Sequence, residues 1–264
     1  MKLIDLNVSI KLNNNDEVIA FLKDNESDII TLQEVMRGID DTVYDRYNNS
    51  KLIKKEISKD YKYNFFGALW VAPYHIKNGV VSKDFGGIAE QGNEVISKYP
   101  IIKANNIFYY KNYGDFTDVT NFRKTDHPRA LEQVILEVEN KKLQLLNIHG
   151  IWTEGKIGDE RTLKQNNFLL KTALENDLPT IIVGDFNLAP ESKSIEILNK
   201  NFKNLITEYN IRSTRPTVRD GLDIGNNIDD YIFANDKIKI NDFKVVVTDI
   251  SDHYPLLLDF DIIN

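Results

Sequence analysis

The sequence contains no cysteine among its 264 residues. A chain without thiols has no disulfide framework, no thiolate metal site and no cysteine nucleophile. Histidine is scarce as well, with four residues in the whole chain. Any metal binding or acid–base chemistry therefore rests on aspartate, glutamate, asparagine and these few imidazoles.

Long apolar runs, linkers and repeats are also lacking. No run approaches the ~18 to 20 apolar residues of a membrane-spanning helix, and the first ten residues lack the apolar core of a secretory signal peptide. We therefore expect a cytoplasmic protein with no membrane span. Without a Pro- or Gly-rich linker or a fixed-period repeat, the sequence predicts one domain over residues 1–264, which we expect to be a monomer.

Positive charge is in deficit. Lys and Arg number 33 and Asp and Glu number 40, so the formal net charge is −7. Such a surface repels nucleic acid and anionic membranes at long range, so any phosphate has to be bound by local groups.

Strand-like runs outnumber helical patterns. Runs rich in Ile, Val, Leu and Phe lie at residues 2–8, 28–34, 62–70, 93–98, 130–138, 142–149, 179–184, 228–234, 243–249 and 255–261. Amphipathic helical patterns lie at residues 14–25, 40–59, 159–175 and 191–200. So many strands with so few helices predict an α/β sandwich, in which two sheets pack together with helices outside.

Several of these apolar runs end in polar side chains. The residues at or just beyond the strand ends are Asn7, Glu34, Asn147, His149, Asp185, Asn187, Asp229, Asp230, Asp252 and His253. Open α/β sheets gather their ligands at such ends. Because strand side chains alternate between faces, the i, i+2 pairs can point to one side and form a cluster.

These residue types suit the hydrolysis of a phosphate ester. Glu34 with Asn7 and an aspartate would supply the oxygen ligands that Mg²⁺ prefers, and Mn²⁺ can substitute for it. Hydrolysis also needs a water held by a base and donors for the phosphate oxygens, for which Asp185, His149 and His253 are suitable groups.

The same positions have structural interpretations. Asn7 can be a turn residue, Glu34 a surface acid, and Asp185 and Asn187 an Asx turn. Arg129, at the start of a strand-like run, can bind a phosphate as a bidentate donor or form a surface ion pair.

Short motifs in a fixed order carry a resemblance. They are LNV around Asn7, LQEV around Glu34, GNEVISKYPI at 92–101, NIHG around His149, GDFN at 184–187, IDDYIF at 228–233 and SDHYPL at 251–256. In this order they resemble the endonuclease/exonuclease/phosphatase superfamily, with its DNase I-like fold. The resemblance implies a four-layered α/β sandwich of two packed mixed sheets flanked by helices. It also implies an enzyme that hydrolyses a phosphodiester or phosphomonoester with Mg²⁺.

The resemblance also implies a role for each matching residue. Glu34 resembles the metal-binding glutamate, with Asn7 beside it, and Asp252 resembles a further metal-site acid. Asp185 resembles the residue that activates the attacking water, and Asn187 resembles its orienting partner.

The remaining motifs concern the phosphate. His253 resembles the histidine that contacts the scissile phosphate, and Asp230 the acid that pairs with it, chosen over Asp229 because the aromatic residue follows it directly. His149 matches the NxH form of the middle motif, in which the histidine contacts the phosphate or assists the leaving group. Asn147 and Arg129 are the predicted substrate-binding residues.

The substrate class stays open. Met36 stands near the position of a lysine in apurinic-site endonucleases, and NIHG replaces their tyrosine-containing motif. The middle motif is similar to that of DNase I, deadenylases, sphingomyelinases, inositol phosphatases and tyrosyl-DNA phosphodiesterases. The expected partner is therefore a phosphoester, either DNA or RNA or a small or lipid phosphoester. The alternative is a catalytically silent binding or scaffold protein that retains the fold.

Overall fold

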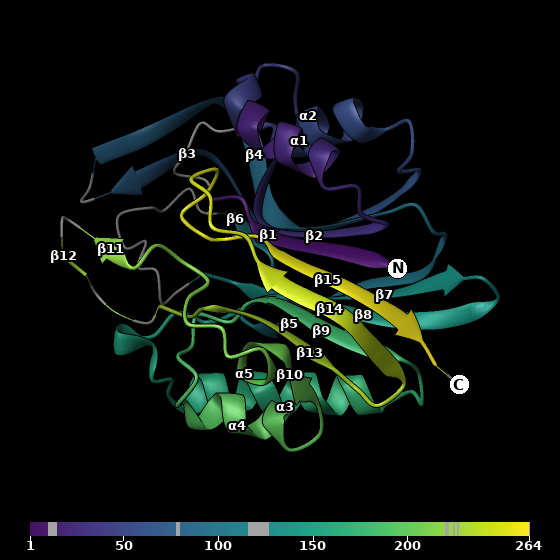
Figure 1. Ribbon diagram of the computed structural model, residues 1–264. Helices are drawn as coiled ribbons and strands as arrows, with labels where there is room; N and C mark the ends of the chain where they lie inside the picture. The colour runs from purple at the N-terminus through teal and green to yellow at the C-terminus, as the bar shows by residue number, and fades with distance from the viewer. Residues whose placement is uncertain are drawn as a thin grey trace.

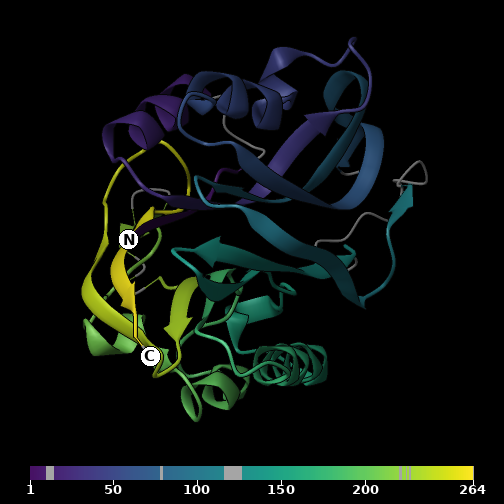
Figure 2. The ribbon, with the colours of Figure 1, turned by 90° about the vertical axis from the view of Figure 1, so that its right-hand side faces the viewer.

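Two β-sheets pack face to face, and helices cover the outer face of each (Figures 1 and 2). This computed structural model describes residues 1–9, 15–77, 80–115, 127–219, 222–223, 225 and 227–263. The order of layers is helices, sheet, sheet, helices, which confirms the predicted four-layered α/β sandwich.

The first sheet is mixed. Its strands lie in the order β14 (Ile238–Val245), β15 (Leu256–Ile262), β1 (Lys2–Asn7), β2 (Ile29–Gly38), β4 (Val80–Ser97), β3 (Tyr63–Lys77) and β6 (Gly114–Asp115). β1 and β2 run parallel, whereas β15 is antiparallel to β1 and β4 is antiparallel to β2.

The second sheet is mixed as well. Its strands lie in the order β10 (Lys203–Asn204), β13 (Asp230–Ala234), β9 (Thr180–Asp185), β8 (Lys141–His149), β7 (Arg129–Val138) and β5 (Ile101–Tyr110). β8 and β9 run parallel, so their carboxyl ends meet at the same edge. A two-stranded ribbon of β11 (Val218–Arg219) and β12 (Leu222–Asp223) lies beside the two sheets.

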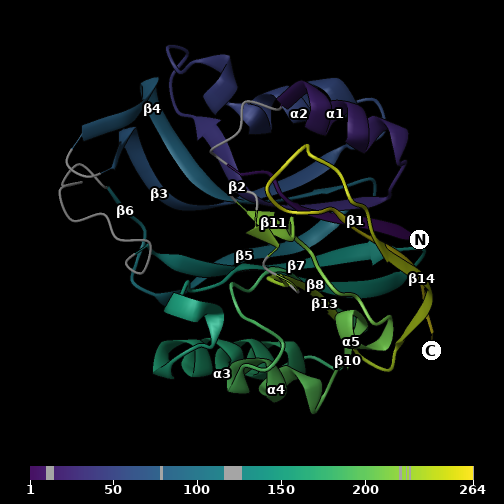
Figure 3. The same cartoon turned by 60° about the vertical axis from the view of Figure 1, so that its left-hand side comes forward.

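Helices shield the outer faces. α1 (Asn15–Asp24) and α2 (Asn49–Ile57) lie over the first sheet, and α3 (Glu160–Leu174), α4 (Lys193–Asn199) and α5 (Leu205–Glu208) lie over the second (Figure 3). Two short 3₁₀ turns, η1 (Asp45–Tyr47) and η4 (Glu154–Lys156), precede α2 and α3. In the described residues no helix is long and apolar enough to cross a membrane.

Alternation along β1 explains why this strand contributes to two of the three apolar clusters in the described residues. Leu3 faces the second sheet and joins its apolar core, whereas Ile4 and Leu6 face α1 and α2. The helices pack on the outer faces of the sheets through apolar stripes, such as the one that contains Val18 and Leu22 on α1. The period of two in the strands and of 3.6 in the helices therefore produces the layers.

The structure departs from the sequence predictions in several elements. The strands predicted at 62–70, 93–98 and 243–249 are Tyr63–Lys77, Val80–Ser97 and Ile238–Val245. The helical pattern at residues 40–59 yields only η1 and α2, because the Asp40 carboxylate accepts hydrogen bonds from the Thr42 and Ile88 amides and forms a turn. β5 was not predicted, because its residues are mostly half-buried at a sheet edge and carry little apolar alternation.

Candidate functional site

The ends of four strands meet at one edge of the sandwich. In the second sheet His149 lies opposite Asp185, and Asp185 lies opposite Asp230. Asn7 ends β1 in the facing sheet and reaches Asp185 through a side-chain hydrogen bond. The connection between β14 and β15 passes beside β1 (Figure 3). Ser251 Oγ in this connection donates a hydrogen bond to the Asn7 carbonyl.

Asp185 is at the centre of this cluster. Its Oδ2 accepts from Asn7 Nδ2 at 3.0 Å, and its Oδ1 accepts from the Asn187 amide at 2.8 Å. His149 Nε2 and His253 Nε2 lie 3.6 and 3.8 Å from Oδ2. Burial is the main cause that raises the pKa of Asp185 to about 7, and the charge of His253 opposes it.

His253 forms a pair with Asp230. Its Nδ1 lies 2.9 and 3.0 Å from the two carboxylate oxygens, and both side chains are buried. Burial opposes a charge on the ring, but the negative charges of Asp230 and Asp185 outweigh it and raise the pKa of His253 to about 9. His253 is therefore an imidazolium at neutral pH. Asp229, the other acid of the doublet, accepts instead from Lys156 at 2.7 Å.

His149 has the opposite protonation. Burial, followed by the charges of Arg129 and His253, holds the pKa of His149 well below its usual value. The ring is therefore neutral at pH 7 and can donate one N–H. Tyr109 donates to its backbone carbonyl at 3.2 Å.

Arg129 is a buried guanidinium in this site. Only 4% of it is exposed, and its Nη1 has no hydrogen-bond partner in the part of the chain that the structure describes. Burial lowers its pKa, and the charges of Asp185 and Glu34 are close enough to oppose that shift. A buried guanidinium with an unsatisfied N–H is suited to an oxyanion.

Glu34 lies in a bulge of β2. The register with β4 shifts between Leu32 and Val35, and Glu34 has a φ of 55°. Asn187 also lies in this left-handed region, with a φ of 54°. Non-glycine residues in this region are strained, and such strain concentrates at functional sites.

Asn147 belongs to a buried polar layer between the sheets. It donates from Nδ2 to Glu132 at 2.7 Å and to the Leu32 carbonyl at 3.2 Å, and its Oδ1 accepts from Gln33 at 2.8 Å. The side-chain amide of Asn147 is fully buried, and its nitrogen and oxygen both form hydrogen bonds with other protein groups. We therefore propose that Asn147 positions the neighbouring His149, in place of the substrate binding expected from the sequence.

Asp252 is engaged by an arginine. Its Oδ2 lies 2.7 Å from Arg215 Nη2. An ion pair competes with a metal for the same carboxylate. The sequence predicted that Asp252 binds the metal. We propose instead that its carboxylate forms a structural ion pair with Arg215.

Some residues near the site were missed by sequence reasoning. They are Asp5, Gln33, Glu132, Lys156 and Arg215. The first three stand inside apolar strand runs, and a charged or amide residue in such a run is a signal of a buried polar layer. Lys156 and Arg215 lie in irregular segments, where no sequence period marks them.

A prediction concerns Asp5, whose Oδ1 accepts from Thr31 and Gln33 at 2.8 Å each. Burial outweighs these hydrogen bonds and raises the pKa of Asp5 from 3.8 to about 8. The folded protein thus binds this proton more tightly than the unfolded chain, and stability is lost as the pH rises from about 4 to about 8. We expect Asp5→Asn to be more stable than wild type at pH 8 and similar to it at pH 4, measured by urea unfolding.

The control for this experiment is Asp242→Asn, the same substitution at an exposed position. It should change the free energy of unfolding by less than about 0.5 kcal/mol at both pH values. A stability difference between Asp5→Asn and wild type that did not change with pH would contradict the assignment.

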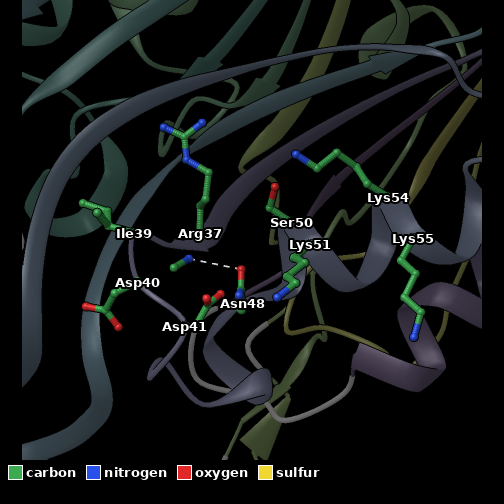
Figure 4. A pocket seen from close by; sticks show the side chains of 10 residues that line it. Arg37, Ile39, Asp40, Asp41, Asn48, Ser50, Lys51, Lys54 and Lys55 are labelled. Carbon is green, nitrogen blue, oxygen red and sulfur yellow. Dashed lines mark hydrogen bonds between the residues drawn. The ribbon is translucent and has the colours of Figure 1, made fainter.

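A separate hollow of about 500 Å³ lies beside α2 and holds none of the site residues above (Figure 4). It is lined by Arg37, Lys51, Lys54 and Lys55 together with Asp40 and Asp41. Arg37 pairs with Glu90 and Lys54 with the buried Glu94. Much of its basic charge is therefore already neutralised within the protein.

Solved structures share this arrangement of strands and helices. The chain is similar to an endonuclease/exonuclease/phosphatase family protein from Leptotrichia buccalis C-1013-b, with 18% identity, 99% of this chain and 100% of that chain covered, and a TM-score of 0.70. It is similar to D. rerio TDP2 complexed with single-strand DNA product, with 15% identity, 99% and 98% covered, and a TM-score of 0.68. A Bacteroides thetaiotaomicron VPI-5482 mannosyl-6-phosphatase has 14% identity, 99% and 100% covered, and a TM-score of 0.65. At these identities the likeness shows a common fold.

No curated protein matches the sequence. A protein-family model does match it, over residues 7–253. The match therefore begins at Asn7 and ends at His253, whose side chains both lie beside Asp185. The fold and the sequence match agree, and the chain belongs to the endonuclease/exonuclease/phosphatase family.

Proposed function

We propose that this protein is a metal-dependent phosphoesterase that hydrolyses a phosphodiester or phosphomonoester by in-line attack of water. The family consists of hydrolytic phosphoesterases, including nucleases and phosphatases. The observation that carries the proposal is the buried group of Asp185, His149 and His253, beside the unsatisfied guanidinium of Arg129. Asp185 can act as the base, His149 and His253 as hydrogen-bond donors, and Arg129 as the group that binds the phosphate.

Each side chain has a protonation state suited to its role. Asp185, with a pKa of about 7, can take a proton from water at neutral pH. The neutral His149 donates a hydrogen bond to a phosphate oxygen, and the imidazolium of His253, held by Asp230, stabilises the developing negative charge. Arg129 binds a further phosphate oxygen.

A divalent cation fits the donor set. Glu34 supplies a carboxylate and Asn7 an amide oxygen, and carboxylate oxygens of Asp185 and Asp230 lie within 4.8 Å of each other. The protonated ring of His253 is a hydrogen-bond donor and is not counted among the ligands. Oxygen-rich sets of this kind suit Mg²⁺ or Mn²⁺. We propose that Glu34 and Asn7 hold the ion, which when bound neutralises charge on the phosphate.

The silent-scaffold alternative is the weaker one. A protein that needed only the fold would gain stability from an apolar residue at each of these positions, because buried charges are costly. This chain instead keeps Asp185, Asp230 and Arg129 buried. Functional sites commonly keep groups that reduce stability.

The similar structures include both substrate classes, and the net charge favours one of them. TDP2 was solved with a single-strand DNA product, and another similar structure is a mannosyl-6-phosphatase. The net charge of −7 favours a small phosphoester or a short strand over a long polynucleotide. We propose a screen of DNA, RNA, nucleotide, inositol phosphate and sphingomyelin substrates, in which turnover on DNA that falls steeply with salt would favour nucleic acid.

Metal binding is tested by thermal melting with increasing Mg²⁺. Wild type should gain stability in proportion to the logarithm of the Mg²⁺ concentration once that exceeds the dissociation constant, by about 2.7 kcal/mol when Mg²⁺ reaches 100 times its dissociation constant. We expect Glu34→Gln to lose most of this gain, because an amide binds Mg²⁺ more weakly than a carboxylate. Chelation with EDTA should abolish turnover by the wild type.

The matched control is Glu196→Gln on α4, which makes the same change at an exposed position on the opposite side of the second sheet. It should be stabilised by Mg²⁺ as wild type is. If Glu34→Gln responds to Mg²⁺ as fully as this control, Glu34 does not hold the ion.

A further inference from the structure

One guanidinium joins the two segments that carry the Asp230–His253 pair. Arg215 Nη1 lies 3.0 Å from Asp229 Oδ2, and Arg215 Nη2 lies 2.7 Å from Asp252 Oδ2. Asp229 directly precedes Asp230, and Asp252 directly precedes His253. Arg215 therefore contacts the neighbour of each member of the pair.

The residue before Arg215 bridges the same two segments through other atoms. Thr214 Oγ1 accepts from the amides of Asp229 and Asp230 at 3.0 and 3.2 Å. Its carbonyl accepts from the Tyr254 amide at 2.7 Å. Two consecutive residues thus connect the start of β13 to the loop that bears the histidine.

This connection matters because His253 does not lie in a strand. It belongs to the connection between β14 and β15, whereas Asp230 begins β13 in the other sheet. Both must stay aligned for Nδ1 to reach Asp230 while Nε2 faces Asp185. A displacement of about 1 Å in such an arrangement costs about 10²-fold in rate.

We propose that Arg215 is a positioning residue that keeps Asp230 and His253 aligned by binding the acid that precedes each of them. The proposal rests on the proposed phosphoesterase function. The planar fork of arginine is essential to it, because its two nitrogens bind two carboxylates at once, whereas lysine is a point charge. Arg215 itself does not have to touch the substrate.

Kinetics with bis(p-nitrophenyl) phosphate and Mg²⁺ test the proposal on the full chain. We expect Arg215→Ala and Arg215→Lys each to lower kcat about 10²-fold with KM changed less than about twofold. Added guanidinium at about 50 mM should restore part of kcat to the alanine variant. Arg161→Ala, which removes an arginine at the start of α3 from its ion pair with the N-cap residue Asp159, should leave both constants unchanged.

A spectroscopic measurement separates positioning from general stability. The Nδ1 proton that His253 shares with Asp230 should give a downfield proton resonance in the wild type, which should be lost in Arg215→Lys even when that variant melts at the wild-type temperature. Retention of the resonance, wild-type kcat in Arg215→Lys, or a change confined to KM would each overturn the proposal. If the wild type shows no turnover, the proposed function fails, while the resonance still decides whether Arg215 aligns the pair.

Discussion

Replacing Asp185 by asparagine is expected to lower kcat about 10³-fold on a phosphodiester in the presence of Mg²⁺, with the fold intact. The amide oxygen can still accept from the Asn187 amide, as Oδ1 does now. The amide nitrogen, however, would face Asn7 Nδ2 and the two histidines, and it cannot take a proton from water. Steady-state kinetics on the purified variant measure the effect.

The pH dependence of stability should change as well. The pKa of Asp185 is raised from 3.8 to about 7, so in metal-free protein stability is lost as the pH rises from about 4 to about 7. Asp185→Asn removes that ionisation, so its melting temperature relative to wild type should be higher at pH 8 than at pH 4. A residue whose ionisation lowers stability but supports turnover is kept for its function.

The matched control is Asp236→Asn, the same substitution at a carboxylate that is 96% exposed. It should leave kcat and melting temperature close to those of wild type. Wild-type kcat in Asp185→Asn would reject Asp185 as the base. Equal losses in both variants would point to a general effect of removing negative charge.

Gly184→Ala is expected to lower the free energy of unfolding by about 3 to 5 kcal/mol, from steric overlap together with backbone strain. Gly184 has a φ of 131°, and a Cβ atom there would lie 2.1 Å from the Ile148 carbonyl oxygen. That oxygen belongs to backbone in the neighbouring strand β8, so it cannot move without disturbing the sheet. Urea unfolding measures the loss.

Activity should fall along with stability in this variant. Gly184 immediately precedes Asp185, and Ile148 immediately precedes His149. Any separation of β8 and β9 therefore moves the Asp185 carboxylate away from the His149 imidazole, whose Nε2 lies 3.6 Å from it.

Gly155→Ala is the control for the steric contribution. Gly155 also has a positive φ, at 67°, but a Cβ atom there would meet nothing within 4 Å. Its alanine variant should lose about 1 kcal/mol from the backbone conformation alone. Equal losses at the two glycines would show that the contact with Ile148 contributes nothing.

Local patterns were sufficient to predict the layered fold. Runs rich in Ile, Val, Leu and Phe predicted β1, β2, β8 and β9 to within one residue at the ends nearest the site, except that β2 continues to Gly38. The strand β5 was missed and the helix before β3 was predicted too long. A half-buried edge strand carries little periodic signal, and a turn made by one carboxylate is invisible to a pattern of apolar spacing.

The residues of the site were predicted as a set, and their contacts were not. The motifs pointed to Asp185, Asp230 and His253. Only the tertiary structure shows that Asn7 donates to Asp185 and that Arg215 donates to the carboxylate of Asp252. Contacts of this kind join residues 37 to 178 positions apart, and no local pattern specifies such pairs.

By itself, the amino-acid sequence determined the layers, the family and the strand ends at which polar groups gather, because side-chain periodicity and short motifs are local properties. Tertiary structure alone decided the protonation of the two histidines. His149 is neutral among cationic neighbours, and His253 is charged between Asp185 and Asp230. The physical reason is that a pKa depends on burial and on charges brought close by folding, and these come from distant parts of the chain.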